Sequence, residues 1–158
     1  MLHDSLATSW YVDPVIYQHE MQTIFARQWL FAAHTSALPS PGTAYACTVG
    51  GHPIILIKRT DGTLSAFHNI CRHRAGRLLK DGMHDVSSSQ SLRCAYHGWR
   101  YGLDGVLSKA SSLSEELECE ARKLCLFPVH IDIWHGLIFV CYAATPDISL
   151  HEHLAPLK

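Results

Sequence analysis

Apolar residues recur at near-helical spacing over residues 14–27, with polar residues between them. The apolar positions are Val15, Ile16, Met21, Ile24 and Phe25. This spacing gives a helix one apolar face. Asp13 directly before Pro14 is typical of a helix start, because Asp caps the first turn and Pro fits its first position. The sequence therefore predicts a helix over about residues 14–27.

The rest of the chain consists of short apolar runs that turn residues interrupt, the pattern of an all-β protein. Strands are expected at residues 29–33, 44–49, 53–59, 64–67, 92–93, 100–101, 106–107, 127–133 and 137–142. Residues 54–57 are apolar without interruption, as in a strand buried on both faces. Asp61-Gly62 is the strongest hairpin signal, and Asp104-Gly105 marks another turn. Residues 113–123 indicate a surface helix or a long loop.

The predicted fold is mainly β, a small antiparallel β-sandwich or barrel with a helical N-terminal arm. At 158 residues the chain is long enough for one domain with its own core. Its 47% hydrophobic and 17% charged residues are ordinary for a soluble globular protein. No apolar run approaches the roughly 18 residues of a membrane span, and the N-terminus lacks the pattern of a secretory signal. We therefore expect a cytoplasmic protein.

The candidate chemistry lies in two short segments that each offer one thiolate and one imidazole. The first is Cys71-x-His73, and after twenty further residues comes Cys94-x-x-His97. This order suits a Rieske [2Fe–2S] cluster, in which two histidines replace two cysteines on one of the two irons. One rival is a structural zinc site, although zinc ligands are commonly spaced as a Cys pair followed by a His pair. Another is a coincidence of residues without a metal.

The remaining cysteines stand in apolar or mixed runs and are expected to be buried free thiols, since unpaired Cys packs as a small hydrophobe. They are Cys47, Cys119, Cys125 and Cys141. A disulfide framework is not expected, because a cytosolic chain more often uses cysteine for metal binding or catalysis.

Several neighbours of the four candidate ligands have expected supporting roles. Gly76, Gly98 and Gly102 would let the backbone approach an inorganic cluster closely. Trp99 would shield the cluster from water. Tyr101 would either hydrogen-bond a ligand sulfur or simply pack, and both readings stay open. Arg74, between the two segments, is included as a further neighbour of the site.

Basic residues gather around the same region, although the chain as a whole has a net charge of −1. Residues 71–100 carry six Lys or Arg against Asp81 and Asp85, a local charge of +4 that leaves −5 for the remainder. The six are Arg72, Arg74, Arg77, Lys80, Arg93 and Arg100. A basic rim would attract an acidic redox partner. A solvated loop rich in Arg is the alternative.

Residues 71–76 (CRHRAG) and 94–101 (CAYHGWRY) resemble the Rieske domain of aromatic-ring-hydroxylating oxygenases, in the large (alpha) subunit. The likeness extends to residues 24–29 (IFARQW), 67–70 (FHNI) and 134–140 (WHGLIFV), and covers roughly residues 10–158. The inter-loop gap is a few residues longer than is usual in that family, and we place the excess near residues 83–91.

The resemblance implies a Rieske-type fold with a cluster-binding subdomain, in which Cys71 and Cys94 bind one iron and His73 and His97 bind the other. It implies electrons arriving from a reductase or ferredoxin. They would pass to a mononuclear non-haem iron on a neighbouring subunit of a trimer, where an aromatic or similar organic substrate is oxidised with O2. That iron belongs to a catalytic domain expected after this chain, so no residue here is assigned a catalytic role.

The expected division is a helical arm at residues 1–38, a Rieske [2Fe–2S] domain at 39–145 and a tail at 146–158 that leads toward the absent catalytic domain. A freestanding Rieske-type ferredoxin is the alternative. Such carriers resemble this core but usually run to about 100 residues without the arm, so the arm favours the oxygenase. No nucleic acid or membrane partner is expected.

Respiratory-type Rieske proteins resemble the motif but add a disulfide between the two loops and a Ser after the second His-Gly. Gly76 and Tyr96 stand at the positions of those cysteines, and Trp99 stands at the position of the Ser. Hydrogen bonds to sulfur raise the potential, so their absence predicts a midpoint at the low end of the Rieske range, on the order of −150 mV.

Overall fold

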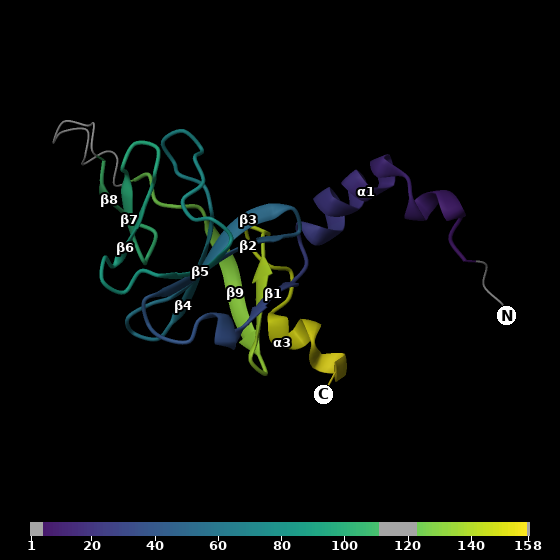
Figure 1. The fold of residues 1–158 in the computed structure, drawn as a ribbon. Coiled ribbons are helices and arrows are strands. Elements are labelled where there is room, and N and C mark those ends of the chain that lie inside the picture. Colours follow the sequence, from purple (N-terminus) through teal and green to yellow (C-terminus); the bar gives the residue numbers. More distant parts are fainter. Residues whose placement is uncertain (1–4, 111–122, 158) are drawn as a thin grey trace.

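A curled antiparallel sheet of seven strands forms the body of the molecule, and a second sheet of three strands covers one end of it (Figure 1). The computed structural model describes residues 5–110 and 123–157. The large sheet has the order β1-β10-β9-β4-β3-β2-β5 and the small one β6-β7-β8. The predicted mainly β fold is confirmed. Most of the predicted 113–123 element lies outside the described residues.

The strands are short and lie close to the ranges that the sequence predicts. The large sheet contains β1 (Leu30–His34), β2 (Thr43–Val49), β3 (His52–Lys58), β4 (Leu64–His68), β5 (Gly82–Asp85), β9 (Pro128–Trp134) and β10 (Leu137–Cys141). The small sheet contains β6 (Ser91–Arg93), β7 (Arg100–Gly102) and β8 (Leu107–Lys109).

Strand β3 is buried on both faces, as its unbroken apolar run predicts. Ile55 and Ile57 belong to one hydrophobic cluster, together with the two candidate cysteine ligands. Ile54 and Leu56 point the other way into a second cluster under β1, β9 and β10. All four side chains are fully buried. Each contributes roughly 1.5–3 kcal/mol by leaving water, so β3 stabilises both halves of the body.

The β3–β4 hairpin turns where Asp61-Gly62 predicts it. One Asp61 carboxylate oxygen accepts hydrogen bonds from the backbone N–H and the hydroxyl of Thr63, at 2.9 and 2.6 Å. Gly62 takes a left-handed φ of 82°, which glycine adopts without steric cost. This turn fixes the register of β4, and β4 leads directly into the first candidate ligand loop.

Strand β5 is absent from the sequence-based prediction, which assigned residues 83–91 only to extra loop. It pairs antiparallel with β2, so that Thr43 lies opposite Asp85 and Tyr45 opposite Met83. Its side chains are half-buried or exposed in alternation, and Met83 is 62% exposed. Backbone pairing rather than an apolar pattern therefore holds this edge strand, and periodicity could not reveal it.

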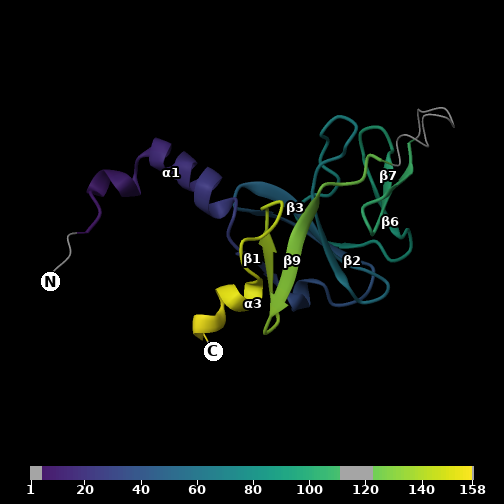
Figure 2. The ribbon, with the colours of Figure 1, turned by 180° about the vertical axis from the view of Figure 1, so that it is seen from behind.

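The N-terminal arm stands away from the sheets in both opposite views (Figures 1 and 2). It contains η1 (Thr8–Tyr11), α1 (Pro14–Glu20) and η2 (Met21–Phe25), in which no residue is buried. Asp13 caps α1 by accepting from the Val15 N–H at 2.8 Å, as predicted. The predicted single helix over 14–27 instead widens into a π-type segment at Met21 and ends at Phe25.

The base of the arm is attached to the end of the chain. The Trp29 indole N–H donates to the Ile148 carbonyl at 2.9 Å, and the Cys141 thiol donates to the Arg27 carbonyl at 3.2 Å. Beyond Ile148 lie α3 (Leu150–His153) and η4 (Ala155–Leu157), and η3 (Thr35–Ala37) follows β1. Across residues 5–110 and 123–157, no helix is both long and apolar enough to cross a membrane.

Candidate iron–sulfur site

Two loops with nearly the same backbone carry the four candidate ligands. In the first, the N–H of Cys71 donates to the Gly76 carbonyl at 2.8 Å. In the second, the N–H of Cys94 donates to the Trp99 carbonyl, also at 2.8 Å. Each loop therefore closes on itself five residues after its cysteine, which holds the cysteine and the histidine of that loop on one tight turn.

The fourth residue after each cysteine adopts the left-handed conformation. Ala75 has a φ of 54° and Gly98 a φ of 73°. Their N–H groups donate to the carbonyls of Cys71 and Cys94, each at 3.0 Å. This second hydrogen bond completes the likeness of the two loops, and it places a non-glycine residue in a region that normally favours glycine.

The loops bring side chains of the same kind together. The rings of His73 and His97 are 4.6 Å apart between centroids at an angle of 72°. Cys71 and Cys94 are 1% and 2% exposed. Burial raises the pKa of the Cys71 thiol, partly opposed by the Tyr101 hydroxyl and the His73 N–H, and Cys94 beside it raises that pKa further. Thiol therefore faces thiol and imidazole faces imidazole, although each loop offers one of each.

Three buried nitrogens of the site have no hydrogen-bond partner in the part of the chain that the structure describes. They are Nδ1 of His73, Nδ1 of His97 and Nε1 of Trp99. Leaving a buried polar atom unpaired costs about 1–3 kcal/mol, and such atoms call for an explanation. Two imidazole nitrogens next to two thiols are the donor set of a Rieske cluster, so the residues present fit the group.

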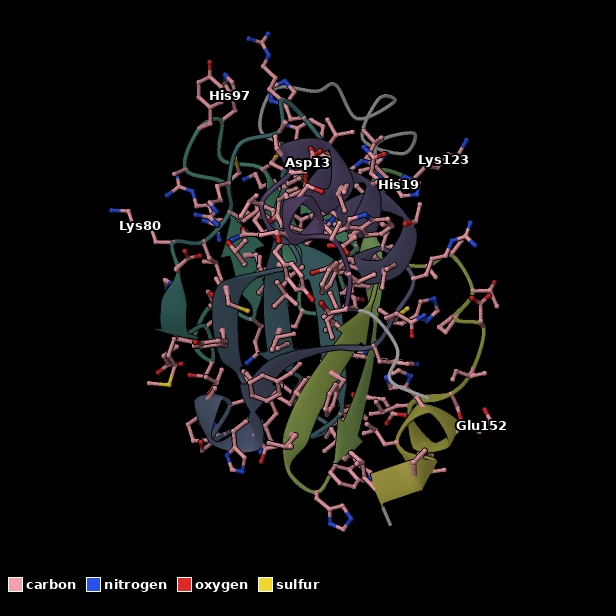
Figure 3. All side chains as sticks on the ribbon, turned by 90° about the vertical axis from the view of Figure 1, so that its right-hand side faces the viewer. Asp13, His19, Lys80, His97, Lys123 and Glu152 are labelled. Carbon is pink, nitrogen blue, oxygen red and sulfur yellow. The ribbon has the colours of Figure 1, made fainter. Side chains whose placement is uncertain are left out.

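Aromatic rings flank both histidines. Trp99, 3% exposed, stacks on His73 with a centroid distance of 4.8 Å and an angle of 9°. Tyr96 leans over His97 with centroids 3.9 Å apart, and is 64% exposed. His97 lies at the opposite end of the molecule from Glu152 of α3 (Figure 3). The imidazole side of the site therefore lies close to the surface.

The sequence left two roles open for Tyr101, a hydrogen bond to a ligand sulfur or simple packing. In the structure Tyr101 makes the sulfur contact. Its hydroxyl lies 3.3 Å from Sγ of Cys71 and accepts from the Arg72 N–H at 3.0 Å. Because that backbone donor uses the hydroxyl as acceptor, the hydroxyl proton is free to point at the sulfur. Tyr101 is fully buried, and burial, followed by the bond to Cys71, raises the pKa of its phenol.

Arg72 anchors the first loop, a role the sequence did not reveal beyond its charge. Its guanidinium donates to the Cys125 carbonyl at 2.7 Å and lies 3.9 Å above the Phe127 ring. Arg74, in contrast, is exposed. The pKa of His73 is lowered by burial first, then by His97 and the charge of Arg74.

Asn69 is a second residue that sequence reasoning missed. It is fully buried. Its amide oxygen accepts from the N–H groups of Leu78 and Leu79, each at 3.0 Å, and its amide nitrogen donates to the Leu79 carbonyl at 2.8 Å. Asn69 thereby ties the entry of the first ligand loop to its exit. In the sequence, Asn69 belongs to the segment 67–70 (FHNI) that carries part of the resemblance, but nothing there indicates its hydrogen bonds.

Gly76 and Gly102 differ in what an added side chain would contact. A Cβ on Gly76 would lie 3.7 Å from Sγ of Cys94, an ordinary van der Waals contact, so the close approach of the two loops does not require glycine at this position. A Cβ on Gly102 would instead collide with the Asp104 carboxylate. The small size of Gly102 serves the β7–β8 turn, and its role beside the cluster stays a prediction.

Of the cysteines expected to be buried free thiols, Cys47 and Cys141 are free, and the described ones differ in burial. Cys141 is buried, whereas Cys47 and Cys125 are only half-buried, and Cys119 lies outside the described residues. Burial, and then the negative charge of Asp81, raise the pKa of the Cys47 thiol to about 11. Cys47 is therefore a poor nucleophile at neutral pH.

Within residues 5–110 and 123–157, no group of three or more His, Cys, Asp and Glu side chains surrounds a single metal position. A single tetrahedral zinc would need all four candidate ligands around one position. A binuclear cluster, in contrast, divides its four ligands between two irons.

An antiparallel β fold that pairs two cysteines and two histidines on twin loops defines an iron–sulfur protein of the Rieske class. The family model described as the Rieske [2Fe-2S] domain matches residues 28–126. The chain belongs to this family, and its cofactor is the Rieske [2Fe–2S] cluster.

The relatives are oxygenase subunits. The large oxygenase component of the 2,4-dinitrotoluene dioxygenase system from Burkholderia sp. (strain RASC) is 38% identical over 138 residues, covering 85% of this chain and 30% of that protein. The glycine betaine monooxygenase oxygenase subunit from Chromohalobacter salexigens is 35% identical over 161 residues, covering 98% and 35%. A naphthalene 1,2-dioxygenase mutant bound to phenanthrene superimposes with a TM-score of 0.81 at 33% identity, covering 93% and 33%.

The resemblance to large subunits of Rieske oxygenases is therefore confirmed. The resemblance extends beyond enzymes that hydroxylate rings, because the glycine betaine enzyme is named for a substrate without a ring. The chain spans about a third of the length of these relatives.

Proposed function

We propose that this chain is the electron-transfer part of a Rieske oxygenase large subunit. Cys71 and Cys94 bind one iron through Sγ, and His73 and His97 bind the other through Nδ1. The observation that carries the proposal is the pair of buried Nδ1 atoms that have no hydrogen-bond partner among the described residues, beside two buried thiols. When bound, the cluster supplies a carrier of one electron.

The two sides of the site have different tasks. The cysteines are almost completely buried, whereas His73 and His97 are half-buried near the surface. The imidazoles therefore form the side through which an electron leaves. Trp99, packed flat on His73, excludes water from that ring, which supports its predicted shielding role.

The electron donor is a reductase or ferredoxin, and the acceptor is a mononuclear non-haem iron in the part of a large subunit that this chain does not span. Relatives named as large components of oxygenase systems support this assignment. The substrate is an organic molecule oxidised with O2, and the working unit is a trimer. A freestanding ferredoxin is the second candidate, but similarity over 98% of this chain to an oxygenase subunit includes the arm and favours the first.

The midpoint potential should lie near the low end of the Rieske range, on the order of −150 mV. No disulfide joins the loops among the described cysteines, and Trp99 offers no hydroxyl at the position after Gly98. The Tyr101 hydroxyl is the side-chain donor that reaches a ligand sulfur. A redox titration with a midpoint above about +100 mV would contradict this assignment.

The ligand assignment is tested by iron and sulfide analysis of paired variants. Cys71→Ser and His73→Ala should abolish or halve the bound iron and bleach the visible spectrum. The matched controls are Cys141→Ser, another buried thiol, and His68→Ala, a half-buried imidazole on β4. Both controls should keep two irons and two sulfides per chain, as expected for a [2Fe–2S] cluster. A colourless wild-type protein with stoichiometric zinc would refute the proposal.

A further inference from the structure

Three basic residues lie side by side across the small sheet. Arg93 on β6 is paired with Arg100 on β7. Arg100 is in turn paired with Lys109 on β8, next to a bulge. Directly paired residues of antiparallel strands project from the same face, about 5 Å apart at Cβ. Arg93, Arg100 and Lys109 therefore form a row of cations, the basic ladder, and all three are exposed.

The opposite face of the same strands is apolar and points inward. Leu92 and Tyr101 are paired on that face, and both are buried with Leu107 in the cluster-side core. Because successive side chains of a strand point to opposite faces, the three basic side chains of the ladder point outward and are not free to turn into the protein.

The ladder is electrostatically unfavourable within the chain itself. Like charges that face each other across two strands destabilise the pairing. In the described parts of the chain the one ion pair joins Arg77 to Asp81, so no described carboxylate compensates the ladder. Three aligned cations that no carboxylate of the described residues compensates form a surface that is complementary to an acidic partner.

The position of the ladder connects it with the cluster. Arg93 immediately precedes Cys94, and Arg100 immediately follows Trp99, so the ladder stands at the base of the second ligand loop. The Cys94–Trp99 backbone hydrogen bond of 2.8 Å joins the same two strands. The small sheet lies at the end of the molecule away from the arm and α3 (Figures 1 and 2).

We propose that Arg93, Arg100 and Lys109 form the docking surface for an acidic protein that donates electrons to the cluster. This inference rests on the proposed function and specifies where the donor binds. In the docked complex one electron passes from the reduced donor to the oxidised cluster, so the donor is oxidised by one electron and this chain is reduced by one. Attraction between opposite charges accelerates encounter near the second ligand loop.

The test uses an acidic plant-type [2Fe–2S] ferredoxin as the probe, because its reduction potential is below that of Rieske centres. The second-order rate constant for reduction of the holoprotein is measured by stopped flow, and binding of the oxidised ferredoxin is measured by calorimetry. The variant is Arg100→Glu in the middle of the ladder. Its matched control is Arg59→Glu, the same charge change at the β3–β4 turn.

We expect Arg100→Glu to lower the rate constant and the affinity about tenfold at low ionic strength, and to remove most of the salt dependence. Arg59→Glu should stay within about twofold of wild type. Equal effects of the two variants, or none from Arg100→Glu with an intact visible spectrum, would overturn the docking surface. Failure of dithionite to reduce the wild-type protein would instead refute the proposed function, so the two failures are distinguishable.

Discussion

Ala75 occupies the left-handed backbone region that Gly98 occupies at the equivalent position of the other loop. For an L-residue this conformation costs about 1–2 kcal/mol of free energy. The hydrogen bond from the Ala75 N–H to the Cys71 carbonyl depends on it. The first ligand loop therefore holds some backbone strain that the second loop avoids.

Replacement of Ala75 by Gly should stabilise the protein by about 0.5 kcal/mol, because relief of the left-handed strain exceeds the backbone entropy that glycine loses on folding. Ala95→Gly is the control in the second loop, at a position without a left-handed φ. It should destabilise by about 0.5–1 kcal/mol. Denaturant unfolding of both variants gives the comparison, and equal destabilisation would exclude strain at Ala75.

Tyr101 should raise the midpoint potential, because its hydroxyl stabilises the extra negative charge that the sulfur carries after reduction. Tyr101→Phe removes a bond of about 1 kcal/mol, which lowers a one-electron midpoint by about 40 mV. Tyr142→Phe is the control, since its half-buried side chain donates from the hydroxyl to the Val49 carbonyl instead of a ligand sulfur. Redox titration of both variants checks this, and equal midpoints would mean that the contact does not tune the cluster.

At the scale of elements, the two ligand loops are held face to face without a covalent link. An ideal Cβ on Gly76 would lie 3.8 Å from Cβ of Tyr96, a separation typical of disulfide-bonded cysteines. Gly76 does not have a left-handed φ, so it can accept a side chain. The backbone is therefore arranged for a bridge that the sequence does not contain.

The double variant Gly76→Cys, Tyr96→Cys should form a disulfide spontaneously in air. The bridge closes a loop of moderate length, so it should stabilise the oxidised protein by about 3 kcal/mol relative to its reduced form. Mass spectrometry detects the loss of two hydrogen atoms, which O2 takes up, and denaturant unfolding measures the stability. The two single-cysteine variants are the controls; a double variant that keeps both new thiols would show that the loops are further apart than described.

The elements that could be predicted from the sequence are those whose burial leaves a periodic pattern. Strand β3 and its hairpin with β4 follow directly from residues 54–57 and Asp61-Gly62. Strand β5 does not, because an exposed edge strand needs no apolar alternation. The four ligand candidates could be read from their residue types and spacing. Asn69 and Arg72 could not, because their partners come from tertiary contacts with Leu78, Leu79, Cys125 and Phe127.

At the scale of the whole molecule, the candidate redox site and a row of basic residues share one end. The cluster loops and the basic ladder lie there, while the arm and the short helix α3 lie at the other (Figure 1). The division into an arm at 1–38, a domain at 39–145 and a tail at 146–158 remains a prediction. The proposed docking surface for the electron donor therefore lies at the same end of the molecule as the cluster loops.

The central claim is that two histidines, His73 and His97, bind one iron of the cluster through Nδ1. Electron–nuclear double resonance of the dithionite-reduced protein, with histidine labelled by nitrogen-15 at Nδ1, measures it directly. The account predicts hyperfine coupling to two histidine nitrogens in the wild-type protein, and unchanged coupling in His68→Ala. Coupling to one histidine nitrogen or to none would contradict it.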